Sequence, residues 1–454
     1  MVQEKSIIKK SILKPQMFEA ITMTKNTKMK QLSLSIATVA MAMFAASCGQ
    51  PTSQGQLVGD YTNRTNYKAP APVGMVFVNS GVMKSGYSDQ DIANSLDAPA
   101  RTLNMVGFYM DATEITNSEY RQFTNWVRDS IAHTTLGDFK DNEDGTQQVD
   151  WTNHIKWTDA DVQDQLAGMF IDASQTGTGK KELDVSKWEY NVRYFDLQGS
   201  ILNPGQPRTQ FDIKKSVKVY PDTTVWVKQF AYSNNEPIAR QYNWFSAFDE
   251  YPVVGVNWIQ ANAFCNWRTQ LWKGARESKK LYFEGNFALP DESQWEWAAR
   301  GGRQMSPYPW GGPTVMNQKG CYLANFKPDR GDYSADGGLY TVRANAYWPN
   351  DYGLYNMSGN VAEWTRSLYV AGAYNANMIS DINPDIKARL SETDPTWQRR
   401  VVVKGGSWRD PAPYLNVSNR DYEYADTAKA YIGFRCVYTQ IAGAINNEPG
   451  RASR

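Results

Sequence analysis

Three segments of the chain combine a helical spacing of apolar residues with a capping signal at their N-terminal end. In the first segment, Thr116 and Glu119 have the spacing of a capping box. Apolar residues three to four positions apart follow, namely Tyr120, Phe123, Val127 and Ile131. Because this period is that of an α-helix, the four side chains share one face. We therefore predict a helix that begins after Thr116 and buries this face.

The same signals predict two further helices. Asn257 with Gln260 begins the second, and the residues expected to face inward are Ala261, Phe264, Cys265 and Leu271. Asp291 with Gln294 begins the third, and its expected buried residues are Trp295 and Ala298. The pair Gly301–Gly302 marks the end of this helix, since glycine is typical of helix C-termini.

Strand signals are short. The apolar runs Met75–Val78 and Val106–Met110 favour strands. Beyond the third helix the chain is rich in Gly, Asn, Asp, Tyr and Trp and has few long apolar runs. This composition is typical of a domain that is held together by aromatic packing and fixed loops rather than by long regular elements.

The apolar pattern weakens over residues 132–248, which we interpret as a large insertion into a domain spanning residues 71–440. The insertion contains two strand-like stretches, Val217–Tyr220 and Thr223–Phe230. It supplies contacts to a partner, or it is a surface subdomain without that role. Residues 441–454 have the composition of a flexible tail.

The first 47 residues have the composition of a secretion signal. Lys25, Lys28 and Lys30 form a positive region directly before an apolar run of 16 residues, Leu32–Ser47, which is shorter than the roughly 20 residues of a membrane-spanning helix. The run ends in small residues followed by Cys48. This pattern resembles a lipobox, in which Cys48 would be acylated and become the mature N-terminus. An ordinary cleaved signal is the alternative. Residues 48–70 then form a linker, and the residues before Met23 or Met29 indicate a misassigned start codon.

Charge and cysteine usage limit the function classes. The formal net charge is +1, but the signal holds seven Lys and two acidic residues, so the rest has 41 basic and 45 acidic residues. No basic stripe remains, which argues against nucleic-acid binding. After Cys48 the cysteines are Cys265, Cys321 and Cys436. Two of them can pair in an oxidising compartment, and their spacing does not say which.

Several blocks, in one order, resemble the formylglycine-generating enzyme (sulfatase-modifying factor) family. They are Met75–Val78, Phe108–Tyr120, Tyr251–Trp267, Leu289–Gly302, Gly353–Trp364, and Gly405–Trp408 with Ile432–Cys436. The resemblance implies that family's fold, an α+β fold that is related to C-type lectin domains and has short strands and much ordered loop. It also implies a disulfide between Cys265 and Cys436, and leaves Cys321 as a spare thiol that we expect to be buried as a small hydrophobic residue.

The resemblance further implies calcium at two places. The motif Asn-x-x-Gly-Asn-x-x-Glu-Trp would supply Asn356, Gly359, Val361 and Glu363, where Gly and Val contribute carbonyl oxygens. A second set would be Asn325, Phe326, Asp336 and Gly338, where Phe and Gly contribute carbonyls. Oxygen ligands of this kind suit Ca²⁺. The alternative is that these side chains only cap and connect loops.

The family's catalytic metal has no ligands in this sequence. Active members bind copper through two cysteines that follow the Gly-Gly-Ser motif, and the corresponding positions here are Asp410 and Leu415. Copper(I) requires soft thiolate ligands, so we expect no copper, no catalytic residue and no enzyme activity. Ser407 remains, and a tight turn is its expected role. The iron-dependent relatives need several histidines, whereas this chain has only His133 and His154.

One branch of the family is more similar than the rest, the GldK/PorK lipoproteins of the gliding-motility and type IX secretion apparatus. The similarity lies in the lipoprotein signal, Trp126–Ser130, Val219–Trp226, Tyr251–Trp258 and the position of the insertion. It implies an outer-membrane lipoprotein that faces the periplasm, assembles into a ring with a GldN/PorN-type partner and with its own copies, and contacts other secretion components. Gly49 in place of Asp favours the outer membrane. The sister lipoprotein GldJ has a related domain, which leaves the branch open.

Three function classes remain. The first is a catalytically silent scaffold of the secretion apparatus, with residues 132–248 supplying partner contacts. Aromatic and Arg residues of the types enriched in interface hot spots occur there, namely Arg193, Tyr194, Trp226, Tyr242 and Trp244, although core packing explains them equally well. The second is a lectin-like protein that binds glycans or other ligands of the envelope. The third is a formylglycine-type oxidase.

Overall fold

The computed structural model describes residues 71–87, 97–142, 145, 147–195, 197–232, 236–279, 281, 285–328, 331–371 and 395–440, all of which lie in one compact unit. The signal, Cys48, the linker and the tail fall outside the described residues. Within the described part of the chain, no helix has the length and apolar character needed to cross a membrane.

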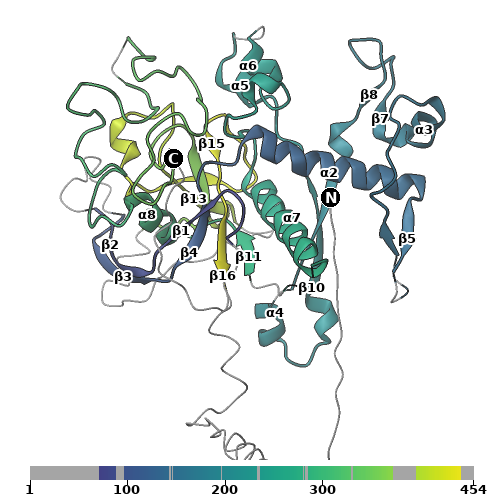
Figure 1. The fold of residues 1–454 in the computed structure, drawn as a ribbon, viewed down its shortest axis with the longest axis horizontal. Helices are drawn as coiled ribbons and strands as arrows, with labels where there is room; N and C mark the ends of the chain where they lie inside the picture. The colour runs from purple at the N-terminus through teal and green to yellow at the C-terminus, as the bar shows by residue number, and fades with distance from the viewer. Residues whose placement is uncertain are drawn as a thin grey trace, which may run out of the picture. The chain divides into compact units, whose positions relative to one another are not determined.

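Two four-stranded sheets form the centre of the fold (Figure 1). The first has the order β1 (Met75–Val78), β4 (Phe108–Asp111), β16 (Val437–Gln440) and β11 (Gly285–Ala288) and is antiparallel. The second has the order β14 (Asp421–Tyr424), β13 (Arg400–Lys404), β12 (Ala362–Leu368) and β15 (Ile432–Gly433). Its last pair, β12 with β15, is parallel. A separate hairpin joins β2 (Gly81–Ser85) to β3 (Arg101–Met105). The strands are short, as the sequence predicts, and the class is α+β.

The three predicted helices are present, and each begins at a complete capping box. They are α2 (Asn117–Leu136), α7 (Trp258–Glu277) and α8 (Glu292–Arg300). Gly301 ends α8 in the left-handed conformation with φ 61°. These capping predictions are confirmed because the signal is local and needs no tertiary contact.

Aromatic rings join α2 to α7 in the main core. The ring of Phe264 stacks on Tyr120 at 5.6 Å and meets the edge of Phe123 at 5.8 Å. The prediction that Leu271 faces inward is wrong, because its side chain is 51% exposed. At this end of α7, Arg268 and Trp272 cover Phe287 of β11 instead.

The insertion is not one separate body. Its hairpin of β9 (Glu189–Phe195) and β10 (Asp212–Lys218) adds Trp188, Tyr190, Val217 and Val219 to the main core. Between β10 and α7, the short helices α5 (Val225–Gln229) and α6 (Pro237–Gln241) bury Trp226 and Tyr242 against Trp408 and Val254. These parts are integral to the domain. A further short helix, α4 (Leu197–Leu202), follows β9.

Residues 137–187 form a distinct part of the insertion, which we call the distal lobe. It contains β5 (Phe139–Asp141), β6 (Gln147–Val149), α3 (Ala160–Gln165), β7 (Phe170–Ile171) and β8 (Glu182–Leu183). Figure 1 shows these elements around the C-terminal end of α2. A small hydrophobic cluster stabilises the lobe, and in it Leu166 and Met169 pack with Ala132 of α2.

Two predictions inside the insertion need correction. Thr223–Phe230, expected to be a strand, contains helix α5. The reason is local, since the Asp222 carboxylate accepts hydrogen bonds from Thr224 N and Oγ1 and so forms a turn from which a helix can start. Val217–Tyr220 is extended only in its first part, because β10 ends at Lys218.

Candidate functional site

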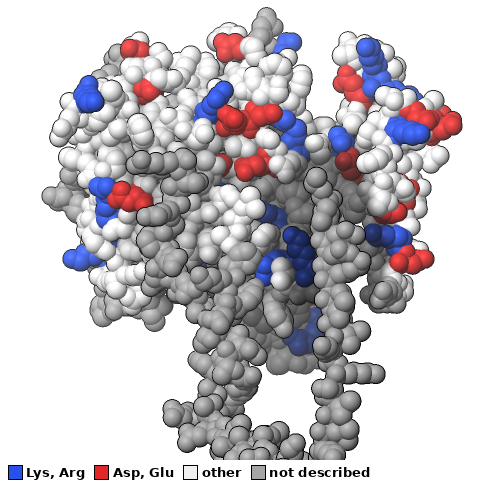
Figure 2. Space-filling view, in the orientation of Figure 1, with Lys and Arg blue, Asp and Glu red and all other residues white. Residues whose placement is uncertain are grey.

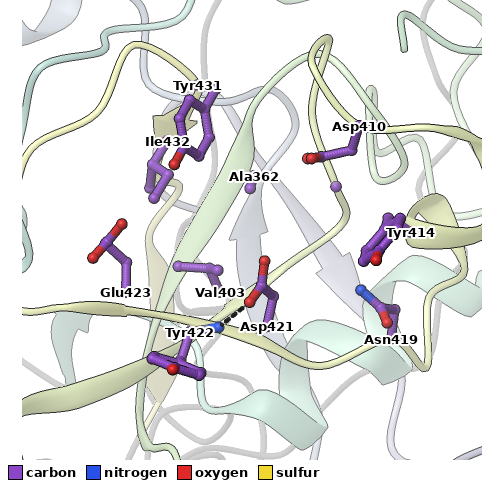
Figure 3. A pocket seen from close by; sticks show the side chains of 11 residues that line it. Ala362, Val403, Asp410, Tyr414, Asn419, Asp421, Tyr422, Glu423, Tyr431 and Ile432 are labelled. Carbon is purple, nitrogen blue, oxygen red and sulfur yellow. Dashed lines mark hydrogen bonds between the residues drawn. The ribbon is translucent and has the colours of Figure 1, made fainter. Parts of the chain in front are cut away.

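A small cavity lies beside the turn that follows β13, at the positions where active relatives are expected to hold copper. Its volume is about 40 Å³. Residues of β12, β13, β14, β15 and the adjoining loops line it, namely Ala362, Val403, Gly406, Asp410, Tyr414, Asn419, Asp421, Tyr422, Glu423, Tyr431 and Ile432. Figure 3 shows the carboxyl groups of Asp410, Asp421 and Glu423 on different sides of this space.

Asp410 serves the turn itself. Its carboxylate accepts hydrogen bonds from Ser407 N at 3.0 Å and Ser407 Oγ at 2.6 Å. Burial raises the pKa of the Asp410 carboxyl above its usual range, and the bonds to Ser407 and the charge of Arg409 oppose this only in part. The structure thus places Ser407 in a tight turn, as expected, with its hydroxyl committed to a carboxylate.

Leu415, the second position of the copper pair, does not line the cavity. Its side chain is fully buried in a separate apolar cluster with Tyr308, Ala324 and Phe326. No group of three or more His, Cys, Asp or Glu side chains able to hold a metal occurs in the part of the chain that the structure describes. The arrangement therefore provides neither a soft metal site nor an activated thiol.

The cavity is acidic. Burial, together with the charges of Asp410 and Glu423, raises the pKa of the Asp421 carboxyl. Glu423 is partly compensated by Lys429, whose Nζ lies 3.4 Å away. Arg409 stacks on Tyr431 at the rim, 4.5 Å from the ring centre. Chemically, such a site can attract cations and protons, and the side chains that line it include no thiol or imidazole.

The two histidines do not contribute to this site. His133 is buried at the end of α2, where its Nδ1 lies 2.9 Å from Asp138 Oδ2. His154 is exposed on the distal lobe. His133 is therefore a core residue of α2 and His154 a surface residue.

The second predicted calcium set comes together around the Asp336 loop. Asp336 accepts hydrogen bonds from Phe326 N at 2.6 Å and from Gly338 N at 3.2 Å. Asn325 is 1% exposed, and its Oδ1 has no hydrogen-bond partner. A Cβ atom added to Gly338 would lie 2.9 Å from this oxygen, so only glycine leaves the approach open. A buried oxygen without a donor costs about 1–3 kcal/mol, which a hard cation would offset, so this set fits Ca²⁺.

The first predicted set is arranged differently. Asn356 Oδ1 is also buried without a partner, which suits a cation. However, Arg435 Nη2 donates to Glu363 Oε1 at 2.7 Å, and Trp295 Nε1 donates to Glu363 Oε2 at 2.8 Å. A calcium ion here would share Glu363 with Arg435. Gly359 and Val361, the predicted carbonyl ligands, are buried on the loop between Asn356 and Glu363.

Glu114 and Asn360 lie beside these sets, and the sequence analysis gave neither of them a role. Glu114 is fully buried, and its carboxylate accepts hydrogen bonds from the amides of Asn356 and Asn360. Burial raises the pKa of Glu114 to about 8, against the opposing charge of Arg435. The only sequence signal was the position of Glu114 in the Glu-Ile-Thr-Asn block, because the contact joins residues more than 240 positions apart.

The structure brings two of the cysteines into contact and leaves a third apart from them. Cys265 Sγ and Cys436 Sγ lie 3.4 Å apart in the core and are free thiols in this structure. The expectation that Cys321 is buried is wrong, since it is exposed. It lies in a turn where Asn317 Oδ1 accepts a hydrogen bond from the backbone N–H of Cys321.

Comparison with known proteins agrees with this fold. The sequence profile of the sulfatase-modifying factor enzyme 1-like domain matches residues 62–440. The chain is 25% identical over 423 residues to the formylglycine-generating enzyme of Mus musculus, covering 89% of each protein. It is 34% identical over 193 residues to the inactive C-alpha-formylglycine-generating enzyme 2 of Bos taurus, covering 41% of this chain and 50% of that protein. Among solved structures, PvdO from Pseudomonas aeruginosa is 16% identical with a TM-score of 0.43, covering 80% of this chain and 93% of that one. The chain belongs to the sulfatase-modifying factor enzyme 1-like domain family.

Proposed function

We propose that this chain is a catalytically silent member of its family that serves as a lipid-anchored structural component of an envelope secretion apparatus. One observation supports the proposal that the protein is not catalytic. Asp410 is bound within the Ser407 turn, and Leu415 is buried in a different cluster, so the two copper positions hold no thiol and do not face one cavity.

The assembly role rests on the similarity to the GldK/PorK lipoproteins in the signal and the insertion. Cys48 anchors the protein in the outer membrane, and the domain faces the periplasm. Its partners are a GldN/PorN-type protein, further copies of this chain in a ring, and other components of the type IX secretion apparatus. Calcium is the proposed structural cofactor, bound by the first predicted set at Asn356 and the second at Asn325. We propose that the protein binds no copper.

The distal lobe is the part of the insertion best suited to partner contacts. It exposes two large aromatic side chains, Phe139 and Trp151, to 42% and 43% respectively. Trp151 also stacks on Trp126 of α2 at 5.4 Å, which fixes its position. By contrast, Trp226 and Tyr242 are 1% and 2% exposed and belong to the core, so they are excluded as interface residues.

Positive and negative side chains are interspersed over the distal lobe in Figure 2, so we do not expect net charge to select the partner there. Aromatic anchors therefore carry the proposed contact, since truncating a hot-spot residue costs about 2 kcal/mol or more.

The test is affinity purification of the protein from its native membrane in mild detergent, comparing the wild type with the double variant Phe139→Ser/Trp151→Ser. Leu271→Ser is the control, because Leu271 is also an exposed apolar side chain, at 51%, but lies on α7 outside the lobe. We expect stoichiometric partners with the wild type and the control, and their loss with the double variant. Equal recovery from all three would place the interface elsewhere, and an absence of partners from the wild type would contradict the scaffold proposal.

A second candidate function is ligand binding, and one observation favours it. A groove of about 150 Å³ between α2 and the end of the insertion is lined by aromatic side chains, namely Tyr120, Trp188, Tyr220 and Trp244. Such an aromatic surface suits an envelope glycan. Quenching of tryptophan fluorescence by cell-wall oligosaccharides, abolished by Trp244→Ala, would support this function over the scaffold.

A further inference from the structure

Glu114 lies where the two predicted calcium sets meet. It follows β4, and its side chain is 0% exposed. Each carboxylate oxygen accepts one hydrogen bond from a different asparagine. Oε2 accepts from Asn356 Nδ2 at 3.2 Å, and Oε1 accepts from Asn360 Nδ2 at 3.0 Å. One side chain therefore contacts both the first set, through Asn356, and the neighbour of the second set, Asn360.

The contact with Asn356 fixes the orientation of its amide. The Nδ2 group donates to Glu114 and also to Ala344 O at 3.0 Å, so both N–H groups are used. Turning the amide over would bring its oxygen against two acceptors, which is unfavourable. Asn356 Oδ1 is thereby held in a buried position without a donor.

Asn360 transmits the same constraint to the second set. Its Oδ1 accepts hydrogen bonds from Asn325 Nδ2 at 3.1 Å and from Val342 N at 2.9 Å. Asn325 Nδ2 also donates to Tyr340 O at 2.8 Å. Both amide N–H groups of Asn325 are therefore used, and its Oδ1 is left buried without a partner as well.

The two asparagine oxygens favour one kind of ligand. Asn356 Oδ1 and Asn325 Oδ1 are both buried, and neither has a hydrogen-bond donor. Amide oxygens are common ligands of hard cations such as Ca²⁺. The geometry of the two side chains therefore favours a hard cation at each place.

We infer that Glu114 is a positioning residue that aims the side-chain oxygens of Asn356 and Asn325 at two calcium ions and couples the two sites. The inference rests on the proposed calcium binding. An ion at one site polarises the amide of its asparagine and strengthens the hydrogen bonds that this amide donates, and the connection Asn356–Glu114–Asn360–Asn325 carries the effect to the other asparagine. Occupancy of either site therefore favours occupancy of the other, and the coupling is reciprocal.

The test uses Glu114→Gln in the full mature chain. Glutamine has one acceptor oxygen in place of two, so it can retain only one of the two asparagine contacts. Calcium binding to the metal-free protein is measured by isothermal titration calorimetry, and folding of each variant is checked by circular dichroism. We expect the wild type to bind two Ca²⁺ cooperatively. We expect Glu114→Gln to weaken both sites by about 5- to 150-fold, the usual range for coupled sites, and to abolish cooperativity.

Matched variants separate the inference from simpler effects. Asp332→Asn removes an exposed carboxylate near the second set that makes no contact with the asparagines, and we expect it to leave binding unchanged. Asn360→Gly tolerates the positive φ of 64° and removes the connection to Asn325 together with the side-chain contacts to Val342, and it leaves the Glu114 contact with Asn356 in place. It should leave the site at Asn356 filled, weaken the site at Asn325 and abolish cooperativity. This variant decides the question if Glu114→Gln does not fold.

The outcomes are distinguishable. If the wild type binds no calcium, the calcium proposal is wrong, and the proposed positioning role of Glu114 is then wrong as well. Two results would leave calcium binding supported but contradict the positioning role of Glu114. In the first, the wild type binds two ions independently. In the second, the folded Glu114 and Asn360 variants bind calcium as the wild type does.

Discussion

The sulfur atoms of Cys265 and Cys436 lie 3.4 Å apart in the core, although 171 positions separate them in the sequence. Cys265 lies on α7, and Cys436 directly precedes β16, so the contact joins a helix to the sheet behind it. Burial raises the pKa of the Cys436 thiol, so its oxidation by thiol exchange is slow once the domain has folded.

We predict that the protein from an oxidising compartment contains the Cys265–Cys436 disulfide and a free Cys321. Closing a loop of this length stabilises the fold by about 5 kcal/mol in the chain-entropy model. Peptide mapping without reductant identifies the pair directly. The double variant Cys265→Ala/Cys436→Ala should lower the free energy of unfolding, and Cys321→Ser should not. A bridge that includes Cys321 would contradict the fold, since Cys321 is exposed and outside this contact.

The ion pair of Glu363 and Arg435 gives a second prediction. Both side chains are fully buried, and Arg435 donates to both carboxylate oxygens. Glu363→Gln should cost about 3–5 kcal/mol of folding stability, because it takes from the buried guanidinium the carboxylate to which it is hydrogen-bonded. Chemical denaturation measures the loss.

The matched control is Glu250→Gln, which removes a partner of Arg343 in a pair that is 63% and 66% exposed. We expect less than about 1 kcal/mol there, because water screens exposed charges. A similar cost at both positions would mean that the Glu363 pair is more accessible to water than its burial indicates.

The acid limit of stability depends in part on Glu296. This buried carboxyl has its pKa lowered to about 2, because Arg300 and Lys404 compensate its charge against the effect of burial. A lowered pKa stabilises the fold at pH values above the unfolded pKa, near 4.5, and this stability is lost as the pH falls towards 2. We predict that Glu296→Gln flattens the dependence of unfolding free energy on pH in this window. An unchanged slope would show that other carboxyl groups govern it.

Local signals were sufficient to predict three helix starts and the first strand, whereas the α+β class followed from the family resemblance. The capping boxes at Thr116, Asn257 and Asp291 lie within four residues, so the sequence contains everything they need. The adjacency of Cys265 and Cys436 followed from family resemblance and not from any local pattern.

The remaining features depend on contacts that no local pattern contains. The turn at Asp222 overrides the strand-like composition of Thr223–Phe230, and Leu271 faces solvent because Arg268 and Trp272 cover the sheet. Glu114 has an ordinary place before a helix in the sequence. Its role arises only when the chain brings Asn356 and Asn360 against it.

The central claim is that this chain keeps the fold of its family without the family's oxidation chemistry. The most direct test incubates the purified domain with copper(I), oxygen and a sulfatase-derived cysteine peptide, and follows the peptide by mass spectrometry beside an active formylglycine-generating enzyme. Because Asp410 and Leu415 supply no thiolate, we predict that the peptide cysteine remains unchanged while the active enzyme converts it. Conversion to formylglycine above the level without protein would contradict the account.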